Sequence, residues 1–341
     1  MDVTTLESAA LLSVVVPVYN EEAVVTAFYQ RLRSVLDTLD VRTEIVFVND
    51  GSADGTHALI RELQRGDSRV AVLDLSRNFG KEAALTAGLD HARGDAIVVI
   101  DADLQDPPEL IPLLLQKWRE GYDVVYAVRS SRNGESWLKK LTAYTFYRVM
   151  SHTGPVAIPQ DTGDFRLLSR RAVLALGKLR ERHRFMKGLF AWIGYRQTGV
   201  SYERDPRHSG YSKWSYWKLW NLALEGVSSF TTLPLRLSTY IGFLTAAGAF
   251  VYGLSIIWKT LLHSNPVPGY PSLLVVILFL GGIQLMSLGV IGEYLGRMFD
   301  EAKQRPLYLV ADYEPAREAR GTEVTANPAS ENTPQHDMTN A

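Results

Sequence analysis

Short apolar runs alternate with longer amphipathic stretches along the first part of the chain. Runs rich in valine and isoleucine predict strands, and they cover residues 13–19, 44–50, 70–76, 96–102 and 122–128. Apolar residues at helical spacing predict helices at about 21–39, 55–65, 81–93 and 108–120. Strands that are apolar almost throughout are usually covered on both faces. Their alternation with helices predicts an α/β fold with a mostly parallel sheet.

Two later stretches are apolar and uncharged. The segment from Leu237 to Trp258 carries no Asp, Glu, Lys or Arg, and a second such stretch runs from about Ser264 to Gly292. Each can supply the roughly 20 residues that a helix needs to cross a bilayer. Two buried helices of a soluble protein are the alternative. The tandem arrangement and the short Pro- and Gly-containing turn favour a transmembrane hairpin with helices at about 237–260 and 271–293.

Charges beside the hairpin predict its orientation. Arg236 precedes the first span, whereas Arg297, Lys303 and Arg305 follow the second, and the connection offers only Lys259. The positive-inside rule therefore places both ends in the cytoplasm of a cell whose inner membrane the protein crosses twice.

These patterns divide the chain into three parts. We expect a cytoplasmic catalytic domain at 1–235, the two spans at 236–300, and a polar tail at 301–341 that is disordered after about 312. The N-terminus has no basic region before its apolar run, so we interpret that run as a first strand and not as a signal peptide. The net charge of -1 gives no basic surface for nucleic acid, and the absence of Cys excludes disulfides and thiolate zinc sites.

Polar residues follow each predicted strand at its carboxyl end, which is the ligand-binding edge of a parallel sheet. The segments are Tyr19–Glu22, "NDGSADGT" at 49–56, "RNFGKEAA" at 77–84 and "DADLQDPP" at 101–108. No GxxxxGK[ST] loop and no early GxGxxG turn is present, so neither phosphate-binding motif is available. Asp101 and Asp103 either form a solvated turn that caps the next helix or hold a divalent cation that carries nucleotide phosphates.

The ordered motifs identify a resemblance. "VVVPVYNEE", "VNDGSADGT", "RNFGKEAALTAGLDHARGD" and "DADLQDPPE" follow one another as in family 2 glycosyltransferases. The resemblance implies a GT-A (nucleotide-diphospho-sugar transferase) fold. "GDFRLLSRRAV", "RHRFMKGLFAWIGY" and the two spans further resemble bactoprenol (polyprenyl-phosphate) glucosyltransferases, which are relatives of dolichyl-phosphate mannose synthases.

For the donor, the resemblance implies a Mg²⁺ or Mn²⁺ ion at Asp101 and Asp103, with Gln105 as a neighbour. Asp50 is expected to contact uridine, although it could instead only shape its own turn. Lys81 is expected to approach the base or the phosphates, and a solvated lysine at the helix start is the alternative. We expect Asp54 and Asp106 to cap the helices that follow them. The remaining donor contacts implied are Pro17, Tyr19, Glu21 and, from a loop closing over the diphosphate, Arg207, Ser212 and Lys213.

For the acceptor, cations should gather where a lipid phosphate meets the membrane surface. The segments at about 134–150 and 212–232 predict amphipathic interfacial helices, with ordinary helices of a soluble core as the alternative. Arg129, Lys139 and Lys140 are the candidate phosphate ligands. Asp161 and Asp164 are the candidate carboxylates at the reacting centre, and Asp164 is either a base, a positioning group or a purely structural one.

The resemblance implies an inverting transfer of a hexose, glucose from UDP-glucose, onto undecaprenyl phosphate for cell-envelope glycosylation such as O-antigen. Other donors remain open, namely GDP-mannose, a UDP-N-acetylhexosamine or UDP-4-formamido-arabinose. A non-catalytic membrane scaffold is the alternative from another class. The glycine-rich spans also allow a homo-oligomer.

Overall fold

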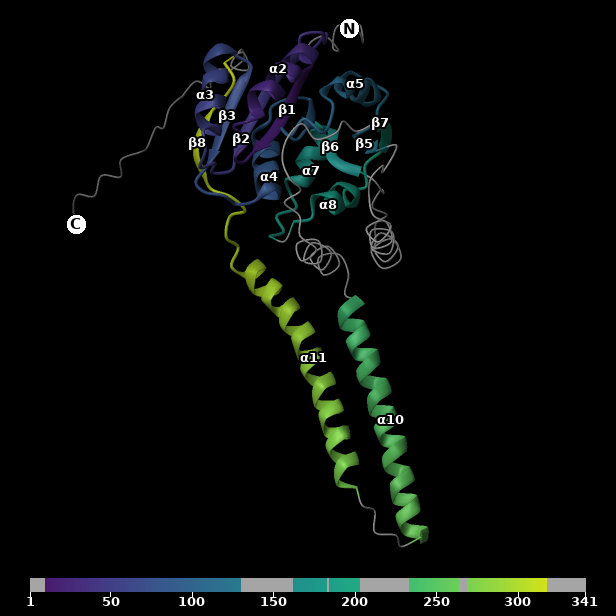
Figure 1. Cartoon of the computed structure of the whole chain (residues 1–341). Coiled ribbons are helices and arrows are strands. Elements are labelled where there is room, and N and C mark those ends of the chain that lie inside the picture. The colour runs from purple at the N-terminus through teal and green to yellow at the C-terminus, as the bar shows by residue number, and fades with distance from the viewer. Residues whose placement is uncertain (1–9, 130–161, 183, 203–232, 264–268, 318–341) are drawn as a thin grey trace, which may run out of the picture.

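The computed structural model describes residues 10–129, 162–182, 184–202, 233–263 and 269–317. Within these ranges the chain forms an α/β domain from which two long helices extend (Figure 1). The predicted interfacial helices at 134–150 and 212–232 lie outside the described residues.

One eight-stranded sheet organises the domain, in the order β7-β5-β6-β4-β1-β2-β3-β8. Its central strands β4, β1, β2 and β3 are parallel to one another, as predicted, whereas β6 and β8 run antiparallel to their neighbours. The strands are β1 Leu11–Val18, β2 Arg42–Asn49, β3 Val70–Leu75, β4 Ala96–Val99, β5 Val124–Arg129, β6 Thr162–Ser169, β7 Gln197–Tyr202 and β8 Val310–Glu314.

Helices cover both faces of this sheet, which is why its central strands β1 to β4 are apolar almost throughout. Phe28 and Leu114 belong to the core on one face, and Leu85 and Phe190 to the core on the other. The helices are α2 Val25–Leu36, α3 Thr56–Gly66, α4 Lys81–His91, α5 Ile111–Arg119, α7 Arg170–Leu176 and α8 Met186–Trp192, with a 3₁₀ turn, η1, at Pro108–Leu110.

Helix α4 packs directly on the central strand. A Cβ on Gly88 would come within 2.2 Å of Val15 Cγ1 on β1, so only glycine permits this approach. The close contact sets the position of the helix start, and Lys81 is the first residue of α4.

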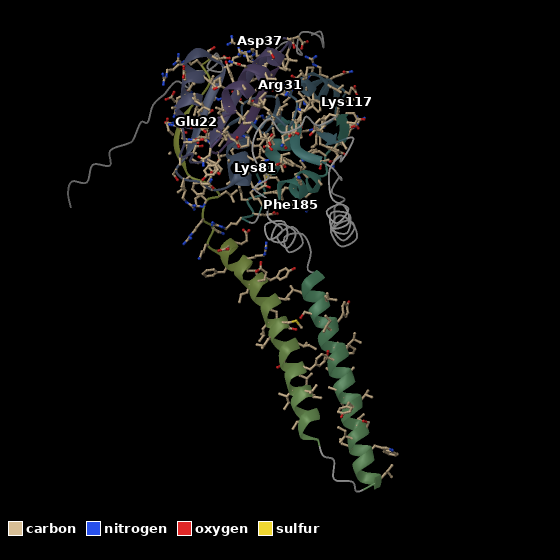
Figure 2. The ribbon with its side chains drawn as sticks, viewed as in Figure 1. Glu22, Arg31, Asp37, Lys81, Lys117 and Phe185 are labelled. Carbon is tan, nitrogen blue, oxygen red and sulfur yellow. The ribbon has the colours of Figure 1, made fainter. Side chains whose placement is uncertain are left out.

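The two extending helices are α10 Leu233–His263 and α11 Tyr270–Ala302. They contain the predicted spans, and the apolar windows 237–258 and 275–302 have mean hydropathies of 1.7 and 2.2, with no described side chain in either window buried in the protein. Ser238 and Ser287 share a hydrogen bond of 2.8 Å between their hydroxyls across the pair. Side chains project outward along both helices (Figure 2). The exposed apolar ones include Phe243, Phe250, Leu285 and Leu288.

The chain after α11 returns to the domain, which the sequence did not predict. We expected no ordered structure after about 312, but β8 pairs antiparallel with β3 through Asp312, Tyr313 and Glu314. The Arg317 amide then donates to the Ser68 carbonyl at 2.8 Å. The expectation is wrong for residues 312–317 because these polar residues gain backbone partners at the sheet edge and a cationic partner on α3.

Candidate active site

The loops after β1 and β2 are joined by hydrogen bonds at the carboxyl edge of the sheet. Asn20 Oδ1 accepts from the Ala53 amide at 2.8 Å, and the Glu21 amide donates to Thr56 Oγ1 at 2.8 Å. Glu22 Oε2 accepts from the Gly55 amide at 2.9 Å, and a Cβ on Gly55 would clash with that carboxylate. The expected convergence of these two loops is confirmed.

Three predicted donor contacts lie on or beside the first of these loops. Pro17 is half-buried on β1, Tyr19 is 46% exposed just past the strand, and Glu21 is half-buried. Asn20 between them has a φ of 53°, a left-handed conformation that turns the chain sharply at the strand end. Asp54 accepts from the Thr56 amide at 3.0 Å, but the N-cap of α3 is Gly55, so Asp54 lies one residue before the position that we predicted for it.

Asp50 holds the neighbouring loop in place. Its carboxylate is 3% exposed and accepts hydrogen bonds from the amides of Phe79 at 2.7 Å and Gly80 at 2.9 Å. Burial raises the pKa of Asp50, although the two amide hydrogen bonds oppose that rise. Asp50 thus fixes the loop that leads into Lys81, a role that we did not predict.

Lys81 joins two carboxylates that are far apart in the sequence. Its Nζ lies 2.7 Å from Asp101 Oδ2, past the end of β4, and 2.6 Å from Asp164 Oδ2 on β6. Burial alone would lower the pKa of Lys81, but the two carboxylates outweigh it and hold the pKa above its usual value. The structure therefore brings three of the predicted site residues together.

The two carboxylates differ in their environments. Burial raises the pKa of Asp101, and the nearby Asp164 adds to that rise while Lys81 opposes it. Burial also acts on Asp164, but Lys81, Lys187 and Arg166 together hold its pKa far below the usual range. Asp164 is thus ionised at neutral pH.

A further carboxylate, Glu82, follows Lys81 in the first turn of α4. Burial and the charge of Asp164 raise the pKa of Glu82 to about 7, against the opposing effect of Lys81, Lys187 and Arg184. Perturbed pKa values of this size are typical of functional sites. Sequence reasoning missed Glu82.

The turn after β4 carries the proposed metal ligands. Asp103 Oδ1 accepts from the Gln105 amide at 3.1 Å, and Leu104 between them has a φ of 60°. Gln105 itself is 5% exposed. Among the described residues no three His, Asp or Glu side chains converge on one point. Two carboxylates fit a hard divalent ion only when other oxygen ligands, such as those of a diphosphate, complete its shell.

Asp106 differs from our expectation. Its buried carboxylate does not cap the following helical turn and instead accepts a hydrogen bond from Tyr202 Oη on β7. Tyr202 also meets Phe165 in an edge-on contact. The cap prediction was wrong because β7, which is distant in sequence, supplies a buried donor at this position.

Several predicted residues cannot be placed. Arg129 ends β5, and only its backbone is described. The others lie outside the described residues: Lys139, Lys140, Asp161, Arg207, Ser212 and Lys213.

One signal in the sequence could have indicated the Lys81 bridge. A lysine at the first position of a helix is opposed by the positive end of the helix dipole. Lys81 occupies that position in α4. The unfavourable placement points to carboxylates elsewhere in the fold that compensate for it.

Comparison with known proteins gives the family. The model of glycosyl transferase family 2 matches residues 13–177, and the GtrB C-terminal hairpin matches residues 233–298. An uncharacterized glycosyltransferase of Synechocystis is 54% identical over 301 residues, which are 88% of this chain and 95% of that protein. The bactoprenol glucosyl transferase of Shigella phage SfV is 50% identical over 299 residues, or 88% and 97% of the two chains.

A more distant relative and a solved structure complete the comparison. The putative glycosyltransferase CsbB of Bacillus subtilis is 44% identical over 302 residues, covering 89% of this chain and 92% of its own. The crystal structure of glucosyl-3-phosphoglycerate synthase from Mycobacterium tuberculosis overlaps 64% of this chain and 78% of that one at 22% identity, with a TM-score of 0.43, a likeness too small to carry an argument.

The two family matches cover different parts of the chain. The first covers the strands that carry Asp50, Asp101 and Asp164, and the second covers α10 and most of α11. The expected GT-A fold is confirmed by the family match, and the hairpin match and exposed apolar helices indicate membrane association. The chain belongs to glycosyl transferase family 2, and it is a glycosyltransferase.

Proposed function

We propose that the protein is an inverting glycosyltransferase that moves glucose from UDP-glucose onto polyprenyl (undecaprenyl) phosphate at the cytoplasmic face of the membrane. One observation carries the proposal, namely the 50% identity that extends over 97% of a bactoprenol glucosyl transferase. The apolar hairpin supports a lipid acceptor, because it brings the catalytic domain to the surface where such a lipid's phosphate lies.

The reaction is a single displacement. An oxygen of the acceptor phosphate forms a bond to C1 of the sugar while the bond from C1 to the UDP oxygen breaks, and UDP leaves with the electron pair. A phosphate monoester has a second pKa of about 6, so the acceptor is already largely anionic at neutral pH. It needs positioning more than deprotonation.

The state of Asp164 agrees with that requirement. Its pKa is held far below the usual range by Lys81, Lys187 and Arg166 despite burial, so it is a weak proton acceptor. We assign Asp164 a positioning role, in which it fixes the Lys81 ammonium at 2.6 Å. Lys81 in turn places positive charge beside Asp101, where the diphosphate of the donor is expected.

Asp101 and Asp103 are the residues that would hold a divalent ion. When bound, Mg²⁺ or Mn²⁺ would neutralise the charge that develops on the departing diphosphate. Their oxygen donors suit either ion.

The other assignments remain part of the proposal. The β1 and β2 loops would receive the nucleoside, and both termini would lie in the cytoplasm with the hairpin crossing the membrane twice. The unplaced contacts are Arg207, Ser212 and Lys213 for the donor, Arg129, Lys139 and Lys140 for the acceptor phosphate, and Asp161 near the reacting centre.

A transfer assay tests the proposal. The full-length protein in detergent is supplied with undecaprenyl phosphate, Mn²⁺ or Mg²⁺, and in turn UDP-glucose, GDP-mannose, a UDP-N-acetylhexosamine and UDP-4-formamido-arabinose, and labelled lipid is extracted. We expect label from UDP-glucose and the inverted anomer by NMR. If a different donor labels the lipid, the sugar of that donor replaces glucose in the proposal. If none of the donors labels the lipid, the enzyme assignment at this site is contradicted.

Asp103→Asn tests the metal site with two readouts. We expect transfer to fall by about 10²-fold or more and Mn²⁺ binding, followed by electron paramagnetic resonance with UDP present, to weaken. Glu120→Gln removes an exposed carboxylate that pairs with Lys117 and serves as the control. Unchanged Mn²⁺ binding in Asp103→Asn would refute the ligand assignment.

A further inference from the structure

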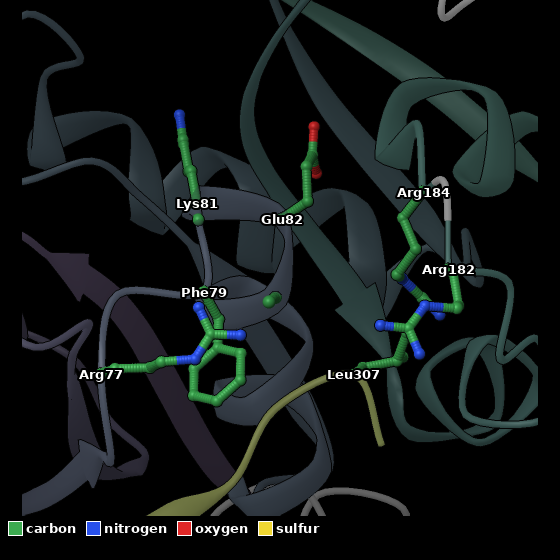
Figure 3. A pocket seen from close by; sticks show the side chains of 9 residues that line it. Arg77, Phe79, Lys81, Glu82, Arg182, Arg184 and Leu307 are labelled. Atoms are coloured by element: carbon green, nitrogen blue, oxygen red, sulfur yellow. The ribbon is translucent and has the colours of Figure 1, made fainter. Parts of the chain in front are cut away.

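The turn that carries the proposed metal ligands is built into the apolar core. Lys81, which contacts Asp101 and Asp164, lines a cavity of about 310 Å³ beside the first turn of α4 (Figure 3). None of the described residues 101–106 lines that cavity. Asp101 and Asp103 are half-buried, and the rest of the turn is buried, namely Ala102, Leu104, Gln105 and Asp106. The position of Asp103 therefore depends on what its own turn packs against.

Leu104 gives this turn a backbone conformation that few side chains adopt. Its φ of 60° lies in the left-handed region, which is unfavourable for a bulky residue and persists only where the surrounding structure holds it. The Leu104 side chain is 7% exposed and belongs to the core on one face of the sheet. Because Leu104 directly follows Asp103, the contacts that hold this conformation also set where the Asp103 carboxylate lies.

A buried tyrosine fixes the end of the turn. Tyr202 is the last residue of β7, and its hydroxyl donates to the carboxylate of Asp106. The two side chains are 6% and 3% exposed. Such a hydrogen bond is costly to lose, because a buried acceptor is then left short of a donor. The bond thus anchors the chain three residues after Asp103.

The same tyrosine contacts the strand that carries Asp164. Its ring meets Phe165 edge-on, with the ring centroids 6.5 Å apart and the planes at 85°. Phe165 follows Asp164 on β6 and is fully buried. In the sheet order, β7 is separated from β6 by β5 and from β4 by β5 and β6. Tyr202 therefore reaches from the edge strand to both elements that carry carboxylates of the site.

We propose that Tyr202 is a positioning residue for the metal site, which holds Asp103 in place through Asp106 and holds β6 beside that turn through Phe165. The inference rests on the proposed function for the ion and for the nucleotide that accompanies it. The contacts themselves join described residues, and they add to the site a residue that is distant from it in the sequence.

Tyr202→Phe tests the hydrogen bond, because it removes the hydroxyl and keeps the ring beside Phe165. Groups that orient metal ligands without touching the metal typically contribute about 10- to 100-fold to metal affinity. We expect the Kd for Mn²⁺ with UDP present, followed by electron paramagnetic resonance on the full-length protein in detergent, to rise by about tenfold or more. An unchanged Kd would refute the inference.

Hydrogen exchange tests the turn in the absence of metal and nucleotide. The Gln105 amide donates to Asp103 Oδ1 at 3.1 Å, so its protection reports on the conformation of the turn. We expect peptides that cover residues 101–106 to exchange about tenfold faster in Tyr202→Phe than in the unmodified protein. Exchange at the same rate in both proteins would show that Tyr202 does not hold the turn.

Tyr29→Phe is the matched control. Tyr29 on α2 is 5% exposed, and its hydroxyl donates at 2.8 Å to Asp67, which is 8% exposed. Asp67 precedes β3 and thus lies at the opposite end of the strands from the Asp103 turn. We expect this variant to leave Mn²⁺ binding and the exchange of residues 101–106 unchanged. Equal losses of Mn²⁺ binding in Tyr29→Phe and Tyr202→Phe would assign the effect to general destabilisation and overturn the inference.

Substitutions of Asp106 separate its hydrogen bond from its charge. Asp106→Asn and Asp106→Ala both remove the charge, but only Asn keeps an oxygen that can accept from Tyr202. We expect Asp106→Ala to weaken Mn²⁺ binding about tenfold more than Asp106→Asn does. Equal Kd values for the two variants would assign the effect to charge and refute the positioning role. This pair also replaces Tyr202→Phe if that variant does not fold.

These readouts are independent of sugar transfer. If Tyr202→Phe alters Mn²⁺ binding and exchange in a protein that transfers no sugar, the proposed function fails and the positioning role stands. In a protein that transfers glucose, Tyr202→Phe should raise the Mn²⁺ concentration for half-maximal rate by the same factor as the Kd and leave KM for the lipid unchanged. A rise in KM for the lipid alone would contradict the role given to Tyr202.

Discussion

At the scale of single residues, Lys81 controls the charge of the site. Its ammonium lies within 2.7 Å of the carboxylates of Asp101, just past β4, and Asp164, on β6. Lys81 also begins α4, and the close contact of Gly88 with β1 sets the position of that helix. Without this cation, Asp101 and Asp164 would repel each other at the sheet edge.

Lys81→Met should therefore impair transfer strongly. We expect a loss of about 10²-fold or more in kcat, measured with UDP-glucose and undecaprenyl phosphate, because the carboxylates lose their shared partner. Lys117→Met, which removes a half-buried lysine that pairs with Glu120 at the end of α5, should retain activity. Equal activity of the two variants would show that the Lys81 bridge is dispensable.

Glu82 makes the stability of the protein depend on pH. Its pKa of about 7 in the folded state exceeds the ordinary value of 4.5, so the folded state binds more protons between these pH values. Stability then falls as pH rises through this window, and the full penalty is present above pH 7.

Glu82→Gln should remove that penalty. We expect the variant to be more stable than the unmodified protein at pH 8 by on the order of 2 kcal/mol and to show no gain at pH 4, measured by thermal unfolding in detergent. Glu62→Gln, at an exposed position on α3, is the matched control. A gain of equal size at both pH values would exclude titration of Glu82 as its cause.

Contacts between side chains that are distant in sequence could not be predicted from the sequence. Asp101, Asp164 and Lys81 were selected from motifs, but their contact depends on β6 pairing antiparallel with β4, which no local pattern specifies. Glu82 was missed because its raised pKa comes from burial and from the charge of Asp164, which is distant in sequence. Asp106 was misread because its partner Tyr202 comes from β7, which is also distant in sequence.

At the scale of elements, β8 depends on one arginine. Arg61 on α3 contacts Asp74 on β3 at 2.6 Å, Asp312 at 2.5 Å and Glu314 at 2.9 Å. Arg61 therefore links Asp312 and Glu314, two side chains of β8, to Asp74 on the neighbouring strand β3.

Arg61→Met should loosen this strand. We expect a loss of about 1–3 kcal/mol in unfolding free energy, mostly because the buried Asp74 loses a partner, and faster tryptic cleavage at Arg317. Arg65→Met, an exposed arginine at the end of the same helix, should change neither. Cleavage at the same rate in both variants would contradict the role given to Arg61.

The periodicity of apolar residues predicted strands β1 to β5 but did not predict the edge strand β8. The apolar runs that became β1 to β5 are buried, and helices cover them on both faces. β8 is polar and mostly exposed, and it pairs with the open edge of β3 beside the charge of Arg61. Neither the open edge of β3 nor the charge of Arg61 can be recognised from the sequence of β8 itself.

At the scale of the whole molecule, the absence of cysteine makes the orientation easy to measure. We expect Ser264→Cys, between the helices, to react with a membrane-impermeant maleimide on intact cells. Ser34→Cys on α2 should react only after the cells are opened. Labelling of Ser34→Cys on intact cells would reverse the proposed orientation.

The return of the chain through β8 has a kinetic consequence. Because the strand that follows α11 is paired into the sheet, the catalytic domain cannot rotate freely about the end of its hairpin. On the proposed function, enzyme and acceptor then meet by lateral diffusion in two dimensions, with the domain already aligned. The encounter rate should follow the mole fraction of acceptor in the bilayer and not its concentration in the bulk volume.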